Sequence, residues 1–238
     1  MRSLCTIAVW FLLVLPASVG RADPTVEVLL SLKADGMNEG DRLQNSSYCL
    51  AAGRQARENG KFGIALDLFT KCLELNSEET RAHLEKGLLF GDERVVLRTR
   101  AISELLFFLA ADPTDIHART ELGGQYMRLG RIAEAEEQFK MAVARDPGDP
   151  YPLGMYGILL IDFTDKVQKG VELERAAIAG IPDEPWFRMN LAWGYVLLGR
   201  YAEARAAAAA AITAIRKSDW GQPAVDEMNQ LLRSIEGK

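Results

Sequence analysis

The chain contains three cysteines and two histidines, which are residue types that often bind metals or take part in catalysis: Cys5, Cys49, Cys72, His83 and His117. A zinc site needs three or four such ligands at suitable spacing, and these five residues do not form such a group. No Cys-x-x-Cys pair is present, which argues against a thiol redox catalyst. We therefore expect no metal and no cofactor. His83 is expected to be a packing residue, and His117 to be either solvated or in contact with a ligand.

Other catalytic patterns are missing from the sequence as well. It contains no Gly-x-Ser-x-Gly nucleophile elbow. Gly123-Gly124 lacks the Lys-Ser/Thr that follows in a phosphate-binding loop. Glu134 and Glu136 stand near Lys140 at helical spacing, which is typical of a solvated helix face. The sequence therefore predicts a protein without catalytic residues.

The first residues have the pattern of an export signal. Arg2 precedes an apolar run from Leu4 to Leu15, and Gly20-Arg21-Ala22 places small residues at both positions that a signal peptidase inspects. We expect residues 1–22 to be a signal peptide cleaved after Ala22, and the protein to be periplasmic or secreted. An uncleaved anchor is the alternative, but the run is shorter than the roughly 20 apolar residues that span a bilayer. No later stretch could span a membrane.

Composition and charge narrow the range of partners. The chain is 48% hydrophobic, which is enough to build a core. Its formal net charge of −5 becomes −7 once Arg2 and Arg21 are removed, and no cluster of Lys and Arg is present. A nucleic-acid partner is therefore not expected, because phosphate binding needs a clustered basic surface. Loss of Cys5 leaves an even number of cysteines, as is usual in an oxidising compartment.

An internal repeat organises the rest of the chain. Its clearest copy spans residues 116–149, with signature residues at Leu122, Gly123, Tyr126, Gly130, Ala135, Phe139, Ala142 and Pro147. This set resembles the tetratricopeptide repeat, a unit of 34 residues, at every signature position except the fourth, where Arg119 replaces a large aromatic residue. The resemblance implies an all-α fold: a right-handed α-α superhelix of tetratricopeptide-type helical hairpins with a C-terminal capping helix.

The pattern also has a direct physical interpretation. Two amphipathic helices meet at a turn at Gly130-Arg131. Small residues at Gly123 and Ala135 let the two backbones approach, while Tyr126 and Phe139 fill the space beside them.

We expect five such repeats and four kinds of segment. Residues 23–45 are expected to be a mobile leader with at most a short helix at 26–33, and the run Ala206 to Ala211 is expected to be helical because alanine is the best helix former. In the most degenerate repeat, the fourth, Gly157, Leu173 and Ala176 hold the signature positions. The segments are the signal peptide 1–22, the leader 23–45, the repeats 46–79, 80–115, 116–149, 150–184 and 185–218, and the capping helix 219–238.

Within the first repeat, Cys49 and Cys72 lie at equal distances from the turn at Gly60-Lys61. In an antiparallel helix pair they would face each other at the same height, so their Cα atoms could come within the ~7 Å that a disulfide requires. We expect a disulfide between them. Two buried, unpaired thiols are the alternative, because free cysteine is a common core residue.

The resemblance further implies that a protein or peptide ligand binds the concave groove lined by the first helices. Aromatic and apolar residues at the lining positions favour a hydrophobic peptide or helix. The alternative is that Trp186 and Trp193 pack internally or against the C-terminal helix near Trp220. The residues expected in the groove are His117, Tyr151, Ile158, Trp186, Met189 and Trp193.

Two functions follow from the resemblance. The first is a non-catalytic scaffold or assembly factor in the bacterial periplasm or envelope, and the alternative is a periplasmic holding chaperone for exported polypeptides. The clamp by which some of these repeats grip a chaperone's C-terminal carboxylates is not expected. Arg54 alone has the right character for it, and Glu85 and Glu121 would repel a carboxylate.

Overall fold

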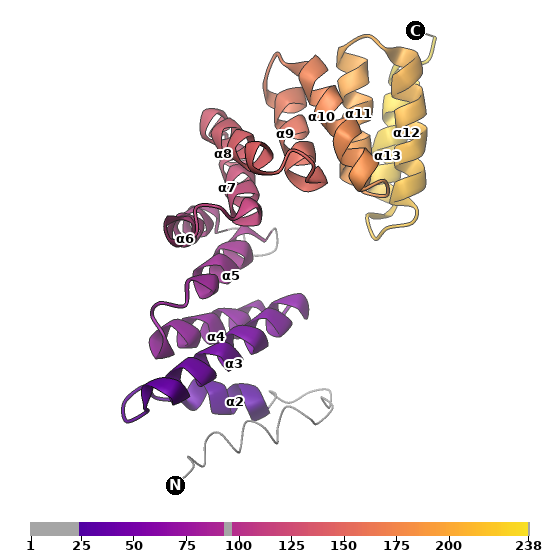
Figure 1. The fold of residues 1–238 in the computed structure, drawn as a ribbon. Helices are drawn as coiled ribbons and strands as arrows, with labels where there is room; N and C mark the ends of the chain where they lie inside the picture. Colours follow the sequence, from indigo (N-terminus) through magenta and orange to yellow (C-terminus); the bar gives the residue numbers. More distant parts are fainter. Residues whose placement is uncertain (1–23, 93–96, 238) are drawn as a thin grey trace. The chain divides into compact units, whose positions relative to one another are not determined.

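The computed structural model describes residues 24–92 and 97–237 (Figure 1). Over these residues the chain is helical with turns between the helices, and the described part contains no strand, which confirms the predicted all-α class. The chain forms two compact units, Met1–Pro113 and Thr114–Lys238. The expected signal peptide and its cleavage after Ala22 lie outside the described residues.

The helices of both units pack in successive pairs, as hairpins of a helical repeat do. The described helices of the first unit are α2 (Pro24–Ser31), α3 (Glu39–Glu58), α4 (Phe62–Leu75), α5 (Thr80–Gly91) and α6 (Arg98–Ala111). Those of the second unit are α7 (Ile116–Arg128), α8 (Ile132–Arg145), α9 (Pro150–Phe163), α10 (Val167–Gly180), α11 (Pro185–Leu197), α12 (Tyr201–Ile215) and α13 (Gly221–Ser234). As expected, the alanine-rich run lies inside a helix, α12.

Glycine ends the first helix in three of the pairs. Gly60, Gly130 and Gly199 have φ angles of 70°, 74° and 70°, a left-handed conformation that costs glycine little. The amide of the next residue then donates to a carbonyl in the last turn of the helix, as in the bond of 2.9 Å from the N–H of Arg131 to the C=O of Tyr126. This turn brings the second helix back along the first.

In the α3–α4 and α7–α8 pairs, a small residue of the first helix is in close contact with a large residue of the second. A Cβ atom added at Gly53 would lie 2.4 Å from the ring of Phe69, and one at Gly123 would lie 2.7 Å from the ring of Phe139. Both rings are fully buried. The two helices thus approach closely at Gly123, as expected, with Phe139 as the residue that covers it, and neither glycine position has room for a side chain.

The segment expected to be a mobile leader is instead part of the first unit, which corrects that prediction. Helix α2 packs on α3 and α4, and its Leu29 and the following Leu32 are buried in the same core cluster as Phe69. Helix α3 begins at Glu39, earlier than the repeat boundary suggested, because the side chain of Asn38 caps it by accepting a bond from the N–H of Asp41.

The fourth repeat differs from its predicted register by one residue in the second helix. Glu174 and Ala177 are buried, whereas Leu173 is half-buried and Ala176 is exposed. The extra residue of this repeat therefore precedes α10, in the turn after α9. As a result a glutamate lies against Gly157, where the sequence suggested a leucine.

Glu136 of α8 is not the solvated carboxylate that its helix pattern suggested. It accepts hydrogen bonds from Lys166 before α10 (2.7 Å) and from the hydroxyl of Tyr156 on α9 (3.1 Å), and it pairs with Lys140 (2.9 Å). These donors, with Lys166 foremost, lower the pKa of Glu136 to about 2. The carboxylate thus joins three helices of the second unit.

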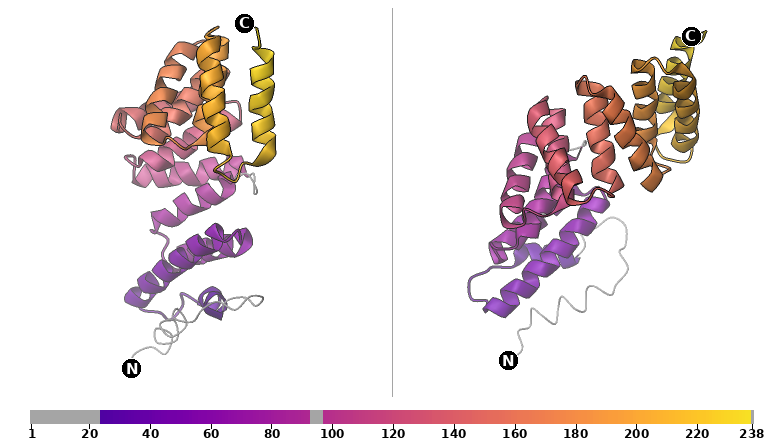
Figure 2. Two further views of the ribbon diagram at one scale, coloured as in Figure 1. Left: turned by 90° about the vertical axis from the view of Figure 1, so that its right-hand side faces the viewer. Right: turned by 45° about the horizontal axis from the view of Figure 1, so that its top comes forward.

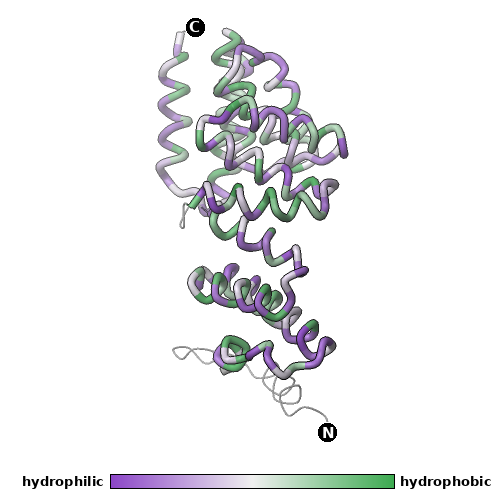
Figure 3. Tube along the Cα trace, turned by 90° about the vertical axis from the view of Figure 1, so that its left-hand side faces the viewer, coloured by the Kyte–Doolittle hydropathy of each residue, from purple (hydrophilic) through white to green (hydrophobic). Residues whose placement is uncertain are grey.

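The last helix covers the end of the second unit. Figure 2 shows α13 alongside α12, and its Val225, Met228 and Leu231 are buried in the core that includes Ala208 and Ala211. Hydrophobic and hydrophilic residues alternate along this helix in Figure 3. The apolar face of α13 therefore covers the core of the last repeat, where a further repeat would otherwise pack, and its polar face is exposed to solvent.

The close contact between paired helices can be tested with two alanine substitutions in the first repeat. Gly53→Ala should lower the free energy of unfolding by about 1–3 kcal/mol, because the new methyl group overlaps the ring of Phe69. Gly63→Ala on α4 is the matched control, because a Cβ atom there meets nothing within 4 Å. It should leave stability unchanged or raise it by up to ~1 kcal/mol. Urea denaturation of both variants checks this.

The pair Gly53→Ala/Phe69→Leu should recover part of the stability lost by Gly53→Ala, because leucine leaves room for the methyl group. Equal effects of the two alanine substitutions would show that the contact does not limit the approach of the helices.

Candidate functional site

The candidate site is the surface formed by the first helices of the second unit, α7, α9 and α11, which we call the first-helix face. Helix α9 lies between the other two and contacts both. A Cβ atom added at its Gly154 would lie 2.3 Å from the ring of Phe187 on α11, so these two helices approach closely.

Two of the six expected groove residues are not on this surface, which corrects their assignment. Ile158 is 1% exposed and Met189 is 7% exposed. The reason is the position of α9, whose residues 152–161 are all buried because other helices pack around it. A helix that is apolar on every side is a core helix, so the apolar character of Ile158 reflects internal packing.

Near the start of α9, Tyr151 forms the centre of a polar and aromatic cluster. Its hydroxyl donates a hydrogen bond of 3.0 Å to Glu121 of α7, and its ring lies 6.5 Å from that of the exposed His117. Burial of much of the phenol, followed by the charge of Glu121, raises the pKa of Tyr151. The cluster therefore presents a neutral hydroxyl, an aromatic ring and one carboxylate.

At the other end of the face, Trp193 of α11 is 36% exposed. Its indole N–H donates a hydrogen bond of 3.2 Å to Glu227 of α13, so the ring is anchored at one edge and remains accessible. Leu197, one turn further along α11, is 60% exposed. Trp186 is half-buried, and the carboxylate of Glu184 caps the start of its helix. Trp193 is therefore exposed, as expected of a groove residue, and it is also bonded to the C-terminal helix, as the alternative had it.

Of the two carboxylates on this surface, sequence reasoning considered Glu121 only as a residue unsuited to a carboxylate clamp, and it did not name Glu227. Glu121 and Glu227 each accept a hydrogen bond from an exposed aromatic residue, Tyr151 and Trp193 respectively. The first pair joins two repeats and the second joins the fifth repeat to the capping helix, so only the packing of successive helices could have placed these residues together. The face therefore combines exposed aromatic rings with negative charge.

In the first unit, the residues compared with a carboxylate clamp bind each other instead. Glu85 is buried at 5% exposure and accepts a hydrogen bond of 2.5 Å from Arg54, while Arg57 lies 3.4 Å from its second oxygen. The one arginine suited to a clamp is thus already paired with a carboxylate of the protein. This arrangement agrees with the expectation that no clamp is present.

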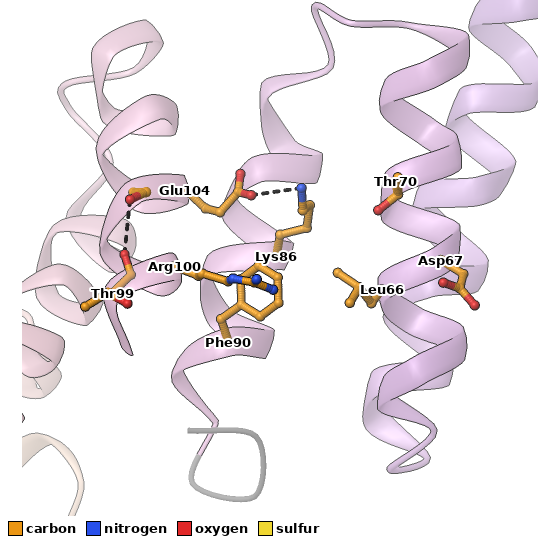
Figure 4. Close-up of a pocket in the computed structure, with 9 residues that line it drawn as sticks. Leu66, Asp67, Thr70, Lys86, Phe90, Thr99, Arg100 and Glu104 are labelled. Atoms are coloured by element: carbon orange, nitrogen blue, oxygen red, sulfur yellow. Dashed lines mark hydrogen bonds and ion pairs between the residues drawn. The ribbon is translucent and has the colours of Figure 1, made fainter. Parts of the chain in front are cut away.

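A cleft of about 560 Å³ opens in the first unit between α4 and α6, with Lys86 and Phe90 of α5 at its base (Figure 4). Lys86 is neutralised by Glu104 at 2.8 Å, and Arg100 lies over the ring of Phe90. Asp67 stands on the opposite wall, so the cleft carries charges of both signs and favours no single ligand chemistry. Its lining residues are Leu66, Asp67, Thr70, Lys86, Phe90, Thr99, Arg100, Ser103 and Glu104.

His83 lies beside this cleft and has a packing role, as expected. Its ring packs against that of Phe107 in a tilted arrangement with centroids 4.1 Å apart, and its Nδ1 atom is hydrogen-bonded to Glu104. Over residues 24–92 and 97–237, no group of three or more His, Cys, Asp or Glu side chains could hold a metal ion. In the same residues, no helix has both the length and the apolar character needed to cross a bilayer.

Cys49 and Cys72 lie on the paired helices α3 and α4 and are both fully buried. The structure holds them as free thiols, so the disulfide stays a prediction. Burial, and then the charge of Cys72, raises the pKa of Cys49 to about 12, and burial also raises the pKa of Cys72. The Cys72 sulfur lies 3.1 Å from the hydroxyl of Ser46. Both thiols are therefore protonated and unreactive at neutral pH while they remain reduced.

Comparison with known proteins identifies the fold. Residues 98–150 match the tetratricopeptide repeat family model. The fold resembles a tetratricopeptide-repeat protein of Thermus thermophilus, TTC0263, with a TM-score of 0.63 at 21% identity over 79% of this chain and 99% of that one. It also resembles pilF of Pseudomonas aeruginosa, with a TM-score of 0.64 at 16% identity over 82% of this chain and 90% of that one.

A third similar structure is YrrB, described as a tetratricopeptide-repeat protein with an unusual peptide-binding site. Its TM-score is 0.57 at 15% identity, over 76% of this chain and 90% of that one. No curated protein matches the sequence. The repeat match over residues 98–150 and the shared architecture together show that this chain has the superhelical hairpin fold of tetratricopeptide-repeat proteins, as the sequence predicted. This fold is typically a module for binding other proteins rather than a catalyst.

The disulfide has a direct chemical test. Peptide mapping of the purified protein without reductant should recover the segments that contain Cys49 and Cys72 as one linked species, which separates after reduction. Closing a loop of this size typically stabilises a protein by about 3 kcal/mol. The reduced protein should therefore denature at a lower urea concentration than the oxidised one.

Recovery of two separate thiol peptides from protein isolated with a trapping reagent present throughout would contradict the disulfide. In that case the thiols of the native protein should react only after unfolding, because both are buried.

Proposed function

We propose that this protein is a non-catalytic scaffold that binds a polypeptide partner on the first-helix face, in the periplasm or envelope of a bacterium. The observation that carries the proposal is the pair Trp193 and Leu197, a tryptophan and a leucine exposed one helical turn apart on α11. Exposed tryptophan and tyrosine are enriched at the energetic centres of protein interfaces. Tyr151 extends the same kind of surface onto α9.

The physical argument rests on how these side chains are held. Trp193 and Tyr151 are each fixed by one hydrogen bond to a carboxylate, at 3.2 Å and 3.0 Å. A fixed ring loses little further conformational freedom when a partner covers it, so it contributes more to affinity than a mobile one. YrrB, a protein of the same fold, has a peptide-binding site, which supports a polypeptide as the ligand class.

Photocrosslinking from the first-helix face tests this function. A photoreactive amino acid at position 197 leaves Trp193 intact and should give one dominant adduct in cells, which mass spectrometry can identify. The same amino acid at Glu134, on the second helix α8, should give no such adduct. Adducts of equal yield from both positions, or none from position 197, would exclude the first-helix face as the binding surface.

A substitution pair shows which side chain is responsible. Trp193→Ala should reduce the adduct from position 197 by about tenfold, the usual effect of removing an interface anchor. Trp220→Ala is the matched control, because Trp220 is also exposed, at 44%, but precedes α13. It should leave the adduct unchanged. Many unrelated adducts, all sensitive to Trp193→Ala, would instead favour the holding chaperone.

The envelope location has its own test. The apolar segment Leu4 to Leu15 and the small residues Gly20 and Ala22 support export with cleavage after Ala22. N-terminal sequencing of the protein from the envelope fraction should then begin at Asp23. An intact Met1 in the cytoplasmic fraction would reject export, and an intact Met1 in the membrane fraction would show that the segment is kept as an anchor.

A further inference from the structure

Glu174 of α10 is a fully buried carboxyl group without a hydrogen-bond partner. Its side chain is 0% exposed, and neither of its oxygens is bonded to another group among the described residues. It lies where α9 and α10 approach most closely. A Cβ atom added at Gly157 would be 2.9 Å from its Cγ atom, and one added at Gly170 would be 2.9 Å from the carbonyl oxygen of Gly157.

The other repeats show what this position normally holds. In each of the first three pairs the residue that covers the glycine of the first helix is apolar and buried. Glu174 is the only charged residue type in this set, although its stem covers Gly157 just as the others cover their glycines. The corresponding pairs are Phe69 over Gly53, Leu105 over Gly87, and Phe139 over Gly123.

Among the described residues, the groups that could balance an ionised Glu174 are absent or engaged elsewhere. On α9, Tyr156 donates to Glu136, and Asp162 is itself an acid. On α11, Arg188 donates to the carbonyl of Pro182, and Tyr195 lies beneath Arg200.

On α10 itself, the other charged side chains are Lys169, Glu172 and Arg175, and none of them bonds to Glu174.

Electrostatics and burial therefore act on Glu174 in the same direction. Burial raises the pKa of Glu174 well above its usual value, and the negative charge of Asp162 raises it further. Burial also raises the pKa of Asp162. A carboxyl group in this setting keeps its proton into a pH range in which ordinary glutamates are ionised.

We propose that Glu174 is a proton-linked switch of the α9–α10 pair. With its proton, the side chain fills the space over Gly157 as a neutral group. Without it, the buried charge favours opening of the two helices to water. Because α9 carries Tyr151 and α11 packs on both helices, the switch would act on the first-helix face. The switch belongs to the free protein and does not depend on the proposed partner.

The sign of the effect follows from the raised pKa. In the open state Glu174 ionises near the usual glutamate value, whereas in the closed state it stays protonated to a higher pH. Between these two values the opening constant rises about tenfold for each pH unit, and above the higher value it levels off. Stability is thus fully present below the usual glutamate pKa and is lost as the pH rises from there through the raised pKa of the closed state.

Hydrogen exchange followed by mass spectrometry, from pH 5 to pH 9 and corrected for the intrinsic exchange rate, measures this opening in peptides of α9 and α10. In the wild type, protection should fall with pH by up to tenfold per unit. In Glu174→Gln it should depend much less on pH, with Asp162 as the remaining group of raised pKa, and it should be higher than in the wild type above about pH 6. Glu172→Gln, two residues away on the exposed side, is the matched control and should follow the wild type. Glu136 titrates near 2, outside this range.

Two further measurements test the switch even if one of these variants folds poorly. Carbon-13 NMR of the Glu174 carboxyl should show a titration midpoint well above the ordinary glutamate value, and a midpoint near that value would overturn the switch. Asp162→Asn should lower that midpoint and weaken the pH dependence, because it removes the neighbouring charge. Protection in α9 and α10 that changes with pH equally in the wild type and in Glu174→Gln would also overturn it.

Discussion

The spacing between paired helices depends on one repeated contact, a small residue of the first helix beneath a large residue of the second. At Gly53 and Gly123 the opposing ring lies where a Cβ atom would be. The contact sets how closely the helices approach, and the left-handed glycine at the turn sets the direction in which the chain returns. Because the spacing and the direction of the second helix are both fixed, one face of the first helix packs against its partner helix. Its remaining faces contact the neighbouring repeat or the solvent.

This close contact between paired helices also explains why Glu174 is buried and titrates unlike an ordinary glutamate. A glutamate on the outer face of α10, such as Glu172, is solvated and bonds to Gln168. Glu174 occupies the covering position instead, where it is fully buried against Gly157 and its oxygens have no hydrogen-bond donor among the described residues. The same helix contact that gives the other repeats an apolar core therefore gives the fourth repeat a titratable one.

Much of the fold could be predicted because the contacts within each helical hairpin join residues that are close in the sequence. Gly123 and Phe139 lie in one helical hairpin, so the sequence alone indicates that they meet. The register of α10 could not be derived in this way, because Leu173 fits a core position better than Glu174 by every rule of burial. The start of α3 could have been found from Asn38, a good N-cap residue followed three positions later by the acidic Asp41. The hydrogen-bond partners of Trp193 and Tyr151 could not be predicted in this way, because they lie on other helices of the stack.

The burial of α9 limits how a partner could be recognised on the first-helix face. Since residues 152–161 are enclosed, α9 exposes little more than its ends, where Tyr151 precedes the buried stretch. Recognition at its centre would have to come from α7 and α11, whose exposed side chains include His117, Trp193 and Leu197. The carboxylates of Glu121 and Glu227 hold two of the rings in place and add negative charge beside them. A partner segment that combined apolar with basic side chains would match both features, because cations are attracted to the faces of aromatic rings as well as to carboxylates.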